Sequence, residues 1–219
     1  MEIEPIAFIK TDFKEKFGLP RQSGQAELTG TIIFEEKYKN DEALRGLEQF
    51  SHIWLLFDFS ASHKDGWHPT VRPPRLGGNK RMGVFATRSP YRPNHIGLSC
   101  VRLEKIEKTA HHGTVLTVSG VDMLDNTPIY DIKPYLPYAD CRPEALSGFA
   151  PDSGSKLEVK FEEGAEEKLP EGKKDVIAAL LANDPRPRYH NDSERVYTME
   201  FAGQEISFRV CGRTVTVLK

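Results

Sequence analysis

The side chains best suited to ligand chemistry are concentrated in residues 83–97, which read Gly-Val-Phe-Ala-Thr-Arg-Ser-Pro-Tyr-Arg-Pro-Asn-His-Ile-Gly. The stretch opens as a short apolar strand at 84–86 and then breaks into a polar loop. Pro90 and Pro93 fix φ and remove backbone donors, so this loop is rigid and continues neither a strand nor a helix. Guanidinium and amide groups on a stiff loop at a strand end are typical of a ligand site. Composition alone leaves a second interpretation open, an ordinary proline-rich turn with solvated arginines.

Positive charge surrounds this loop. Between His63 and Arg102 the sequence holds eight basic residues against one acid, Asp65, although the whole chain has a formal net charge of −2. The basic residues are Lys64, Arg72, Arg75, Lys80, Arg81, Arg88, Arg92 and Arg102. Such clustering predicts a phosphate-bearing partner. Cover of the arginines by acids from elsewhere in the fold is the alternative.

Length and composition limit the class of protein. A chain of 219 residues with 38% hydrophobic and 28% charged residues predicts one large globular domain, or a medium domain and a small one. No apolar run approaches the length of a membrane span, and the acidic N-terminus does not resemble a secretory signal. Cys100, Cys141 and Cys211 are far apart and odd in number, which predicts reduced thiols, a cytoplasmic location and no zinc site.

The elements that must position the loop are mostly strands. We expect strands at 4–10, 26–34, 50–59, 98–108, 114–121 and 129–133, with a short helix at 42–49. This pattern predicts a β-barrel or a β-sandwich. The run 50–59 is the most apolar and is expected to be buried on both faces. Residues 60–82 form a long loop whose aromatics and arginines favour an ordered binding surface.

A glycine- and serine-rich stretch at 147–155 predicts a boundary between domains 1–150 and 151–219. Beyond it we expect a strand at 156–161, a helix at 175–183, a hairpin of 196–201 with 205–210, and a strand at 214–218. This second unit is small for independent stability, so it is expected to dock on the first domain or on another subunit.

Several motifs of other enzyme classes are absent from the sequence. There is no Gly-x-Gly-x-x-Gly after a strand, no phosphate-binding Gly-x-x-x-x-Gly-Lys-Ser/Thr loop and no Gly-x-Ser-x-Gly elbow. The histidines at 63, 68, 95, 111 and 112 lack the helical spacing with a glutamate that binds metals, so a metal site is the weaker hypothesis. Cys100 is expected to lie mid-strand, buried and inert, which argues against a cysteine nucleophile.

The string at 83–94 resembles the signature of the TrmO (YaeB, TsaA-like) family. The resemblance extends to 50–54 (Phe-Ser-His-Ile-Trp), 72–79 (Arg-Pro-Pro-Arg-Leu-Gly-Gly-Asn), 131–135 (Asp-Ile-Lys-Pro-Tyr) and 184–187 (Asp-Pro-Arg-Pro). It implies an S-adenosylmethionine-dependent tRNA methyltransferase acting on the exocyclic N6 of threonylcarbamoyladenosine at position 37, beside the anticodon. It also implies a homodimer and a mainly β fold, with a single-sheeted antiparallel barrel, a short helix and a small α+β C-terminal domain.

Carried over by position, the resemblance implies a set of cofactor-binding residues. They are Ser23, Gly24, Gln25, Ser60, Ala61, Arg88, Leu98, Ser119, Gly120, Val121 and Asp122. Backbone beside Gly24 and Gly120 can approach a small ligand closely. Asp122 would accept from ribose hydroxyls or the amino group, and Arg88 would pair with the carboxylate. One departure is His95, where the family has proline, and we assign it no role.

On this basis the catalytic residues would be Asn94, Arg92 and Tyr91. Asn94 would hold the adenine edge through its amide, and Arg92 and Tyr91 would position or stack the extruded base. The RNA-binding residues would be Arg72, Arg75, Lys80, Arg81 and Arg186, contacting the anticodon arm. The string 184–187 has two readings, part of the site or a helix stop. Two rival functions stay open: a non-catalytic RNA-binding β-domain and a metal-dependent hydrolase built on the histidines.

Overall fold

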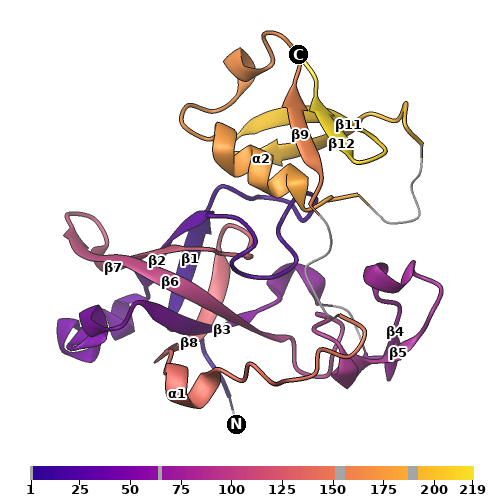
Figure 1. The fold of residues 1–219 in the computed structure, drawn as a ribbon. Helices are drawn as coiled ribbons and strands as arrows, with labels where there is room; N and C mark the ends of the chain where they lie inside the picture. Colours follow the sequence, from indigo (N-terminus) through magenta and orange to yellow (C-terminus); the bar gives the residue numbers. More distant parts are fainter. Residues whose placement is uncertain (1, 64–65, 151–155, 187–191) are drawn as a thin grey trace.

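Six antiparallel strands close into a barrel with the order β1-β2-β7-β6-β3-β8 (Figure 1). The computed structural model describes residues 2–63, 66–150, 156–186 and 192–219. The barrel strands are β1 Ala7–Thr11, β2 Thr29–Phe34, β3 His52–Asp58, β6 Ile96–Thr109, β7 Gly113–Ser119 and β8 Thr127–Pro134. The barrel closes because β1 pairs with β2 on one side and with β8 on the other. The predicted mainly β fold, with a single-sheeted antiparallel barrel, is confirmed.

The barrel wall has one buried face. Along β3, Ile53, Leu55 and Phe57 are buried in the interior, whereas Trp54 and Leu56 point outward and are half-buried. The prediction that this run is buried on both faces is therefore wrong. In a barrel of this size side chains fill the interior, and the alternate residues of every strand face outward.

The short elements outside the barrel differ from the predicted ones. The expected helix at 42–49 is replaced by two 3-10 turns, η2 Asp41–Leu44 and η3 Leu47–Gln49. They are separated at Gly46, whose φ of 87° lies in the left-handed region and ends a helical path. The expected strand at 84–86 is also a 3-10 turn, η6 Val84–Ala86, and the chain before it forms the strand β5 Met82–Gly83. The other short elements are η1 Glu36–Tyr38, η4 Ser60–Ser62, β4 Thr70–Val71, η5 Pro74–Leu76, α1 Pro137–Asp140 and η7 Glu166–Lys168.

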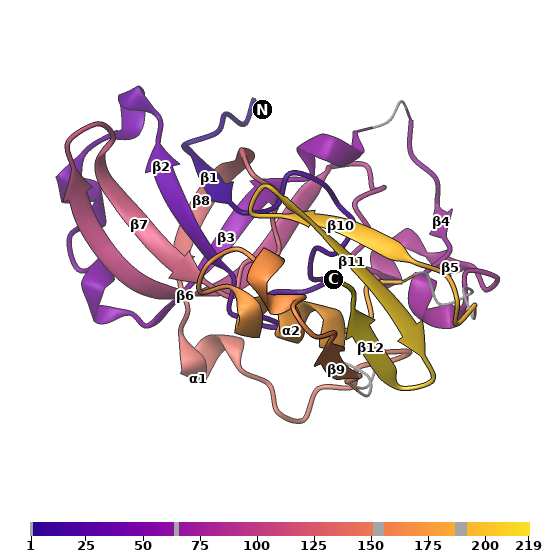
Figure 2. The same ribbon diagram turned by 90° about the horizontal axis from the view of Figure 1, so that it is seen from above.

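β4 and β5 form a small hairpin that stands apart from the barrel. Thr70 pairs with Gly83 and Val71 with Met82. Figures 1 and 2 both show this hairpin on the side of the molecule opposite to the β6–β7 turn. The described residues of the long loop predicted at 60–82, which are 60–63 and 66–82, thus include a two-stranded ribbon.

The C-terminal unit is a four-stranded sheet of order β10-β11-β12-β9 covered by the helix α2. Its elements are β9 Glu158–Phe161, α2 Lys174–Ala182, β10 Tyr197–Phe201, β11 Gln204–Cys211 and β12 Thr214–Val217. β9 runs parallel to β12, while the other pairs are antiparallel. The predicted helix and strands are found within two residues of their expected bounds. The predicted boundary at 147–155 includes residues 151–155, which lie outside the described residues.

Residues 12–25, which lie between β1 and β2, hold the two units together. Figure 1 shows this segment between the barrel and the C-terminal sheet. Phe13 is 1% exposed and its ring lies 5.0 Å from the ring of Phe201. Asp12 accepts from the Ala202 amide through its carbonyl at 3.0 Å and pairs with Lys173 through its carboxylate at 2.7 Å. The small unit therefore buries apolar surface against the first one, which compensates for its limited core.

At Gly97 the backbone of the barrel wall lies very close to a side chain of the barrel core. A Cβ placed on Gly97 would lie 2.2 Å from the ring of Phe57, which is buried inside the barrel. Gly97→Ala is therefore expected to destabilise the fold by about 3 kcal/mol through overpacking, and to lower Tm by roughly 6–12 °C. Thermal melts measure this. Gly83→Ala is the matched control, because a Cβ there meets nothing within 4 Å; equal melting temperatures of the two variants would contradict the prediction.

Candidate functional site

An open cleft of about 2600 Å³ lies where the barrel end, the loops before β6 and the C-terminal unit meet. The predicted site residues that line it are Ser23, Gln25, Ser60, Ala61, Arg72, Arg81, Arg88, Tyr91, Arg92, Asn94, Leu98, Asp122 and Arg186. The lining does not include Gly24, Lys80, Ser119, Gly120 or Val121. The side chain of Arg75 lies outside the described part of the structure. One cleft thus brings together residues predicted for cofactor, base and RNA.

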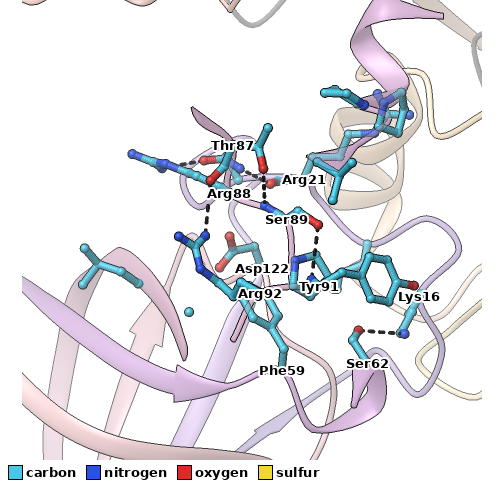
Figure 3. Close-up of a pocket in the computed structure, with 18 of the residues that line it drawn as sticks. Lys16, Arg21, Phe59, Ser62, Thr87, Arg88, Ser89, Tyr91, Arg92 and Asp122 are labelled. Carbon is cyan, nitrogen blue, oxygen red and sulfur yellow. Dashed lines mark hydrogen bonds between the residues drawn. The ribbon is translucent and has the colours of Figure 1, made fainter. Parts of the chain in front are cut away.

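The loop between η6 and Asn94 is held in place by its own hydrogen bonds. The Thr87 hydroxyl donates to the Val84 carbonyl at 2.8 Å and accepts from the Ser89 amide at 3.3 Å. Arg92 donates to the Thr87 carbonyl at 3.2 Å, and the Tyr91 amide donates to the Ser89 hydroxyl at 3.2 Å (Figure 3). These bonds add to the stiffness that Pro90 and Pro93 impose.

Asp122 and Arg88 place opposite charges on one wall of the cleft. The Ser99 hydroxyl donates to Asp122 Oδ1 at 2.7 Å. Burial raises the pKa of the Asp122 carboxyl, while the bond from Ser99 and the positive charge of Arg88 act in the opposite direction. Arg88 donates to Gln22 Oε1 at 2.5 Å. Figure 3 shows Arg88, Arg92 and Asp122 on one side of the cavity, with Lys16 and Ser62 on the other.

Gly24 and Gly120 contact each other and thereby position this wall. The Gly24 amide donates to the Gly120 carbonyl at 2.9 Å. Both residues have left-handed φ, 73° and 78°, and a Cβ on Gly120 would lie 3.3 Å from the Gly24 nitrogen. The two turns can approach so closely because neither residue has a side chain. Their contact brings Ser23 and Asp122 to the cleft. Ser119, at the end of β7, instead donates to Glu104.

Lys16 is a cleft residue that sequence reasoning missed. Its ammonium donates to the Ala61 carbonyl at 2.7 Å and to the Ser62 hydroxyl at 2.9 Å. It thereby ties η4 to residues 12–25. No motif or spacing in the sequence indicates this contact.

The basic residues of the loops are not neutralised by described carboxylates. Within the described ranges, no carboxylate forms an ion pair with Arg72, Lys80, Arg81, Arg88 or Arg92. Direct ion pairing with acids from elsewhere, the alternative raised by the sequence, is therefore not seen for these residues, although the charge of Arg88 acts on the pKa of the Asp122 carboxyl. The cleft keeps the positive character that a phosphate backbone would require.

Arg186 differs from the other arginines. It donates to both carboxylate oxygens of Asp184, at 2.8 and 3.0 Å, and its side chain is 13% exposed. Its carbonyl accepts from Arg21 at 3.2 Å. Asp184 has a φ of 50° directly after α2. Asp184 therefore follows the end of the helix at Ala182, and Asp184 and Arg186 line the cleft, while Pro187 lies outside the described residues.

A buried carboxylate under the Asn94 loop was also missed. Asp58, at the end of β3, is 8% exposed and lies 2.8 Å from His63 Nε2. The His63 ring lies 4.5 Å from the His95 ring, and the His95 carbonyl accepts from the Phe59 amide at 2.9 Å. The ring contact with His63 gives His95, which has no role in the sequence analysis, a structural partner beside Asn94.

Two properties concern metals and membranes. Over the described ranges, no group of three or more His, Cys, Asp or Glu residues is arranged to hold a metal ion. Over the same ranges, no helix combines the length and the apolar character that crossing a bilayer demands.

Comparison with known proteins gives consistent matches over both units. The family model of the tRNA-methyltransferase O N-terminal domain matches residues 8–141, and that of the TrmO C-terminal domain matches residues 154–219. A protein of Escherichia coli (strain K12) named tRNA (adenine(37)-N6)-methyltransferase is 43% identical over 202 residues, covering 88% of this chain and 85% of that protein. A protein of the same name from Eikenella corrodens is 48% identical over 162 residues, covering 74% and 91%. A crystal structure of TrmO from Pseudomonas aeruginosa superposes with a TM-score of 0.81 and 35% identity, covering 100% of this chain and 98% of that one.

Proposed function

This chain belongs to the tRNA-methyltransferase O family, and on that premise we propose that it methylates N6 of threonylcarbamoyladenosine at position 37 of tRNA. It is a tRNA (adenine(37)-N6)-methyltransferase, the activity for which its E. coli and E. corrodens relatives are named. The finer proposal is the threonylcarbamoyl group, with S-adenosylmethionine as methyl donor and the anticodon arm as the RNA contact. It is carried by one observation: Asn94, Arg88 and Asp122 all line one basic cleft.

The residues of the cleft fit S-adenosylmethionine. Arg88 would pair with the carboxylate of this molecule, and Asp122 would accept from its ammonium or ribose hydroxyls. Ser23, Gln25, Ser60, Ala61 and Leu98 would complete the cofactor wall. A half-buried carboxylate that accepts from the hydroxyl of Ser99 suits a ligand that brings further donors. When bound, the cofactor supplies an electrophilic methyl group on a sulfonium.

The protein's own contribution to the reaction is orientation and removal of water. Asn94 would hold the paired donor and acceptor edge of the adenine. Tyr91, 40% exposed, offers a ring face to the extruded base. Arg92, fixed on the Thr87 carbonyl, would position it. The proton of the amine leaves to a carboxylate or to water.

The charge of the threonylcarbamoyl group supports the proposal that the substrate adenosine carries it. Its threonyl part ends in a carboxylate, which adds one negative charge to the phosphates of the RNA. Arg72, Arg81, Arg88 and Arg92 all line the cleft and have no ion pair with a described carboxylate. Guanidinium groups that form no ion pair with a described carboxylate suit binding of a substrate carboxylate.

A homodimer in the cytoplasm completes the proposal. Ile96 and Leu98 point outward from β6, 36% and 52% exposed, and both border the cleft. Apolar side chains in such a position suit burial by a second copy. The three cysteines are free thiols, which agrees with a reducing compartment.

The test is incubation of the enzyme with methyl-labelled S-adenosylmethionine and total tRNA, followed by nucleoside analysis. We expect the label in threonylcarbamoyladenosine at position 37. The matched substrate is tRNA from cells unable to make the threonylcarbamoyl group, in which labelling is expected to be lost. Equal labelling of both tRNAs would overturn the substrate but not the methyltransferase. Tight binding of tRNA with no label in either would instead favour a non-catalytic RNA-binding protein.

A further inference from the structure

Two large aromatic side chains are exposed next to each other at the edge of the cleft. Phe85 is 72% exposed and Trp67 is 48% exposed. Their ring centroids lie 6.1 Å apart with an angle of 31° between the planes, and both residues line the cleft. Apolar rings grouped in this way on a surface are typical of a binding site, whereas single exposed rings need no explanation.

The two rings are held by a rigid framework. Trp67 precedes β4 and Phe85 follows β5, so the hairpin pairing of Thr70 with Gly83 brings them together. Val84, next to Phe85, is 1% exposed, and its amide donates to the Pro69 carbonyl at 2.9 Å. Phe85 is therefore exposed by the fold and not by a lack of local structure. A preorganised ring pair binds a flat partner at a low cost in entropy.

The surroundings of the ring pair select a negatively charged partner. The sequence from 66 to 102 contains no aspartate or glutamate. Arg72 and Arg81 line the same cleft and form no ion pair with a described carboxylate. Arg81 donates to the Thr70 hydroxyl at 3.4 Å, which holds its side chain against the hairpin. Exposed aromatics interleaved with such cations are characteristic of single-stranded nucleic acid binding.

We propose that Trp67 and Phe85 form a stacking subsite for an unpaired nucleobase that flanks adenine 37 in the anticodon loop. The subsite rests on the proposed function, because it requires tRNA as the substrate. It is separate from the position of the target base, which Tyr91 and Asn94 serve. Unpaired loop bases stack on aromatic side chains, and the arginines beside the hairpin would hold the neighbouring phosphates. The subsite would fix the register of the loop and so present position 37 to the cleft.

The experiment uses the full-length enzyme and a synthetic anticodon stem-loop that carries threonylcarbamoyladenosine. Trp67→Ala and Phe85→Ala are each expected to raise the Kd for this RNA about 10- to 100-fold. The conservative variants Trp67→Phe and Phe85→Tyr are expected to restore most of the affinity, because they keep a ring face. Binding of S-adenosylmethionine, measured by calorimetry, is expected to stay unchanged. Tyr138→Ala is the matched control, since Tyr138 is 83% exposed and does not line the cleft.

Abasic RNAs make the test specific to stacking. We expect that removing the base at position 36 or at position 38 weakens wild-type binding, and that the loss does not add to the loss caused by Phe85→Ala. Fully additive losses at both positions would overturn the stacking subsite. So would a shift from dimer to monomer for Phe85→Ala in sedimentation, because the rings would then be a contact between copies of this chain. Failure of the proposed function is distinguishable, since the wild-type enzyme would then leave the stem-loop unmethylated.

Discussion

Asp122→Asn is expected to weaken binding of S-adenosylmethionine about 10- to 100-fold and, at neutral pH, to raise Tm. The loss of affinity follows from the removal of charge-assisted hydrogen bonds, which contribute about 1.5–3 kcal/mol each. The gain in stability follows from the position of the carboxylate. Burial raises the pKa of Asp122 above its ordinary value of 3.8, so the folded chain holds a proton there more tightly than the unfolded chain does.

The sign of the pH dependence follows from this shift. A carboxyl whose pKa is raised on folding stabilises the fold below the unfolded pKa, and this stabilisation is lost as the pH rises through the folded pKa. Once the pH lies above the unfolded pKa, the buried Asp122 carboxyl therefore costs stability, and asparagine removes that cost. Thermal melts from pH 4 to 8 are expected to show a difference in Tm between variant and wild type that shrinks toward acid pH. Calorimetry is expected to show wild-type affinity for the cofactor rising with pH over the range where Asp122 ionises.

Asp125→Asn is the matched control. Asp125 belongs to the same turn but does not line the cleft. It accepts from the Thr11 amide at 3.1 Å and lies 3.8 Å from Lys10 Nζ, so its removal is expected to lower Tm and to leave cofactor affinity unchanged. A variant at Asp122 that melts lower than wild type and binds the cofactor normally would place Asp122 among the structural residues.

The barrel could be predicted because its strands alternate. β6 alternates between outward-facing and buried residues from Ile96 to Val101, and β6 and β7 were both placed within two residues of their observed bounds. The prediction failed where backbone conformation and tertiary contacts outweigh the pattern. At 84–86 three apolar residues suggested a strand, yet only Val84 is buried and Phe85 is exposed, so the turn is set by the contact of Val84 with the hairpin. Periodicity cannot detect such a contact.

The site was predictable only in part, because its residues come from distant segments. The prolines and arginines of the loop that carries Asn94 indicate a ligand site from the sequence alone. Lys16 bridges to Ala61 across 45 positions, and Asp58 lies at the end of an apolar strand where a carboxylate has no local signal. Long-range hydrogen bonds of this kind depend on which loops the fold brings together. The family resemblance supplied residues on both sides of the cleft, while the structure shows that Gly24 and Gly120 contribute by contacting each other.

Asn94→Ala is expected to lower kcat about 100-fold at saturating cofactor and RNA, the largest effect of a single side chain in this site. The amide is the group in the loop that matches the paired donor and acceptor of an adenine edge, a pairing that contributes about 1–3 kcal/mol. Its loss also removes the orientation of the amine, which adds to the barrier. Single-turnover rates with the modified stem-loop measure the chemical step directly.

Asn94→Asp separates hydrogen bonding from size. It keeps the shape of the side chain but replaces the amide donor with a second acceptor, so it is expected to be impaired nearly as much as the alanine variant. Asn79→Ala, at an exposed asparagine outside the cleft lining, is the matched control and is expected to keep the wild-type rate. A full rate for Asn94→Asp would mean that the loop needs only the bulk at position 94. Another group would then hold the adenine edge, and Arg92, two residues before Asn94 in the sequence, is the candidate. The stiff loop would then shape the cleft without forming a hydrogen bond to the base.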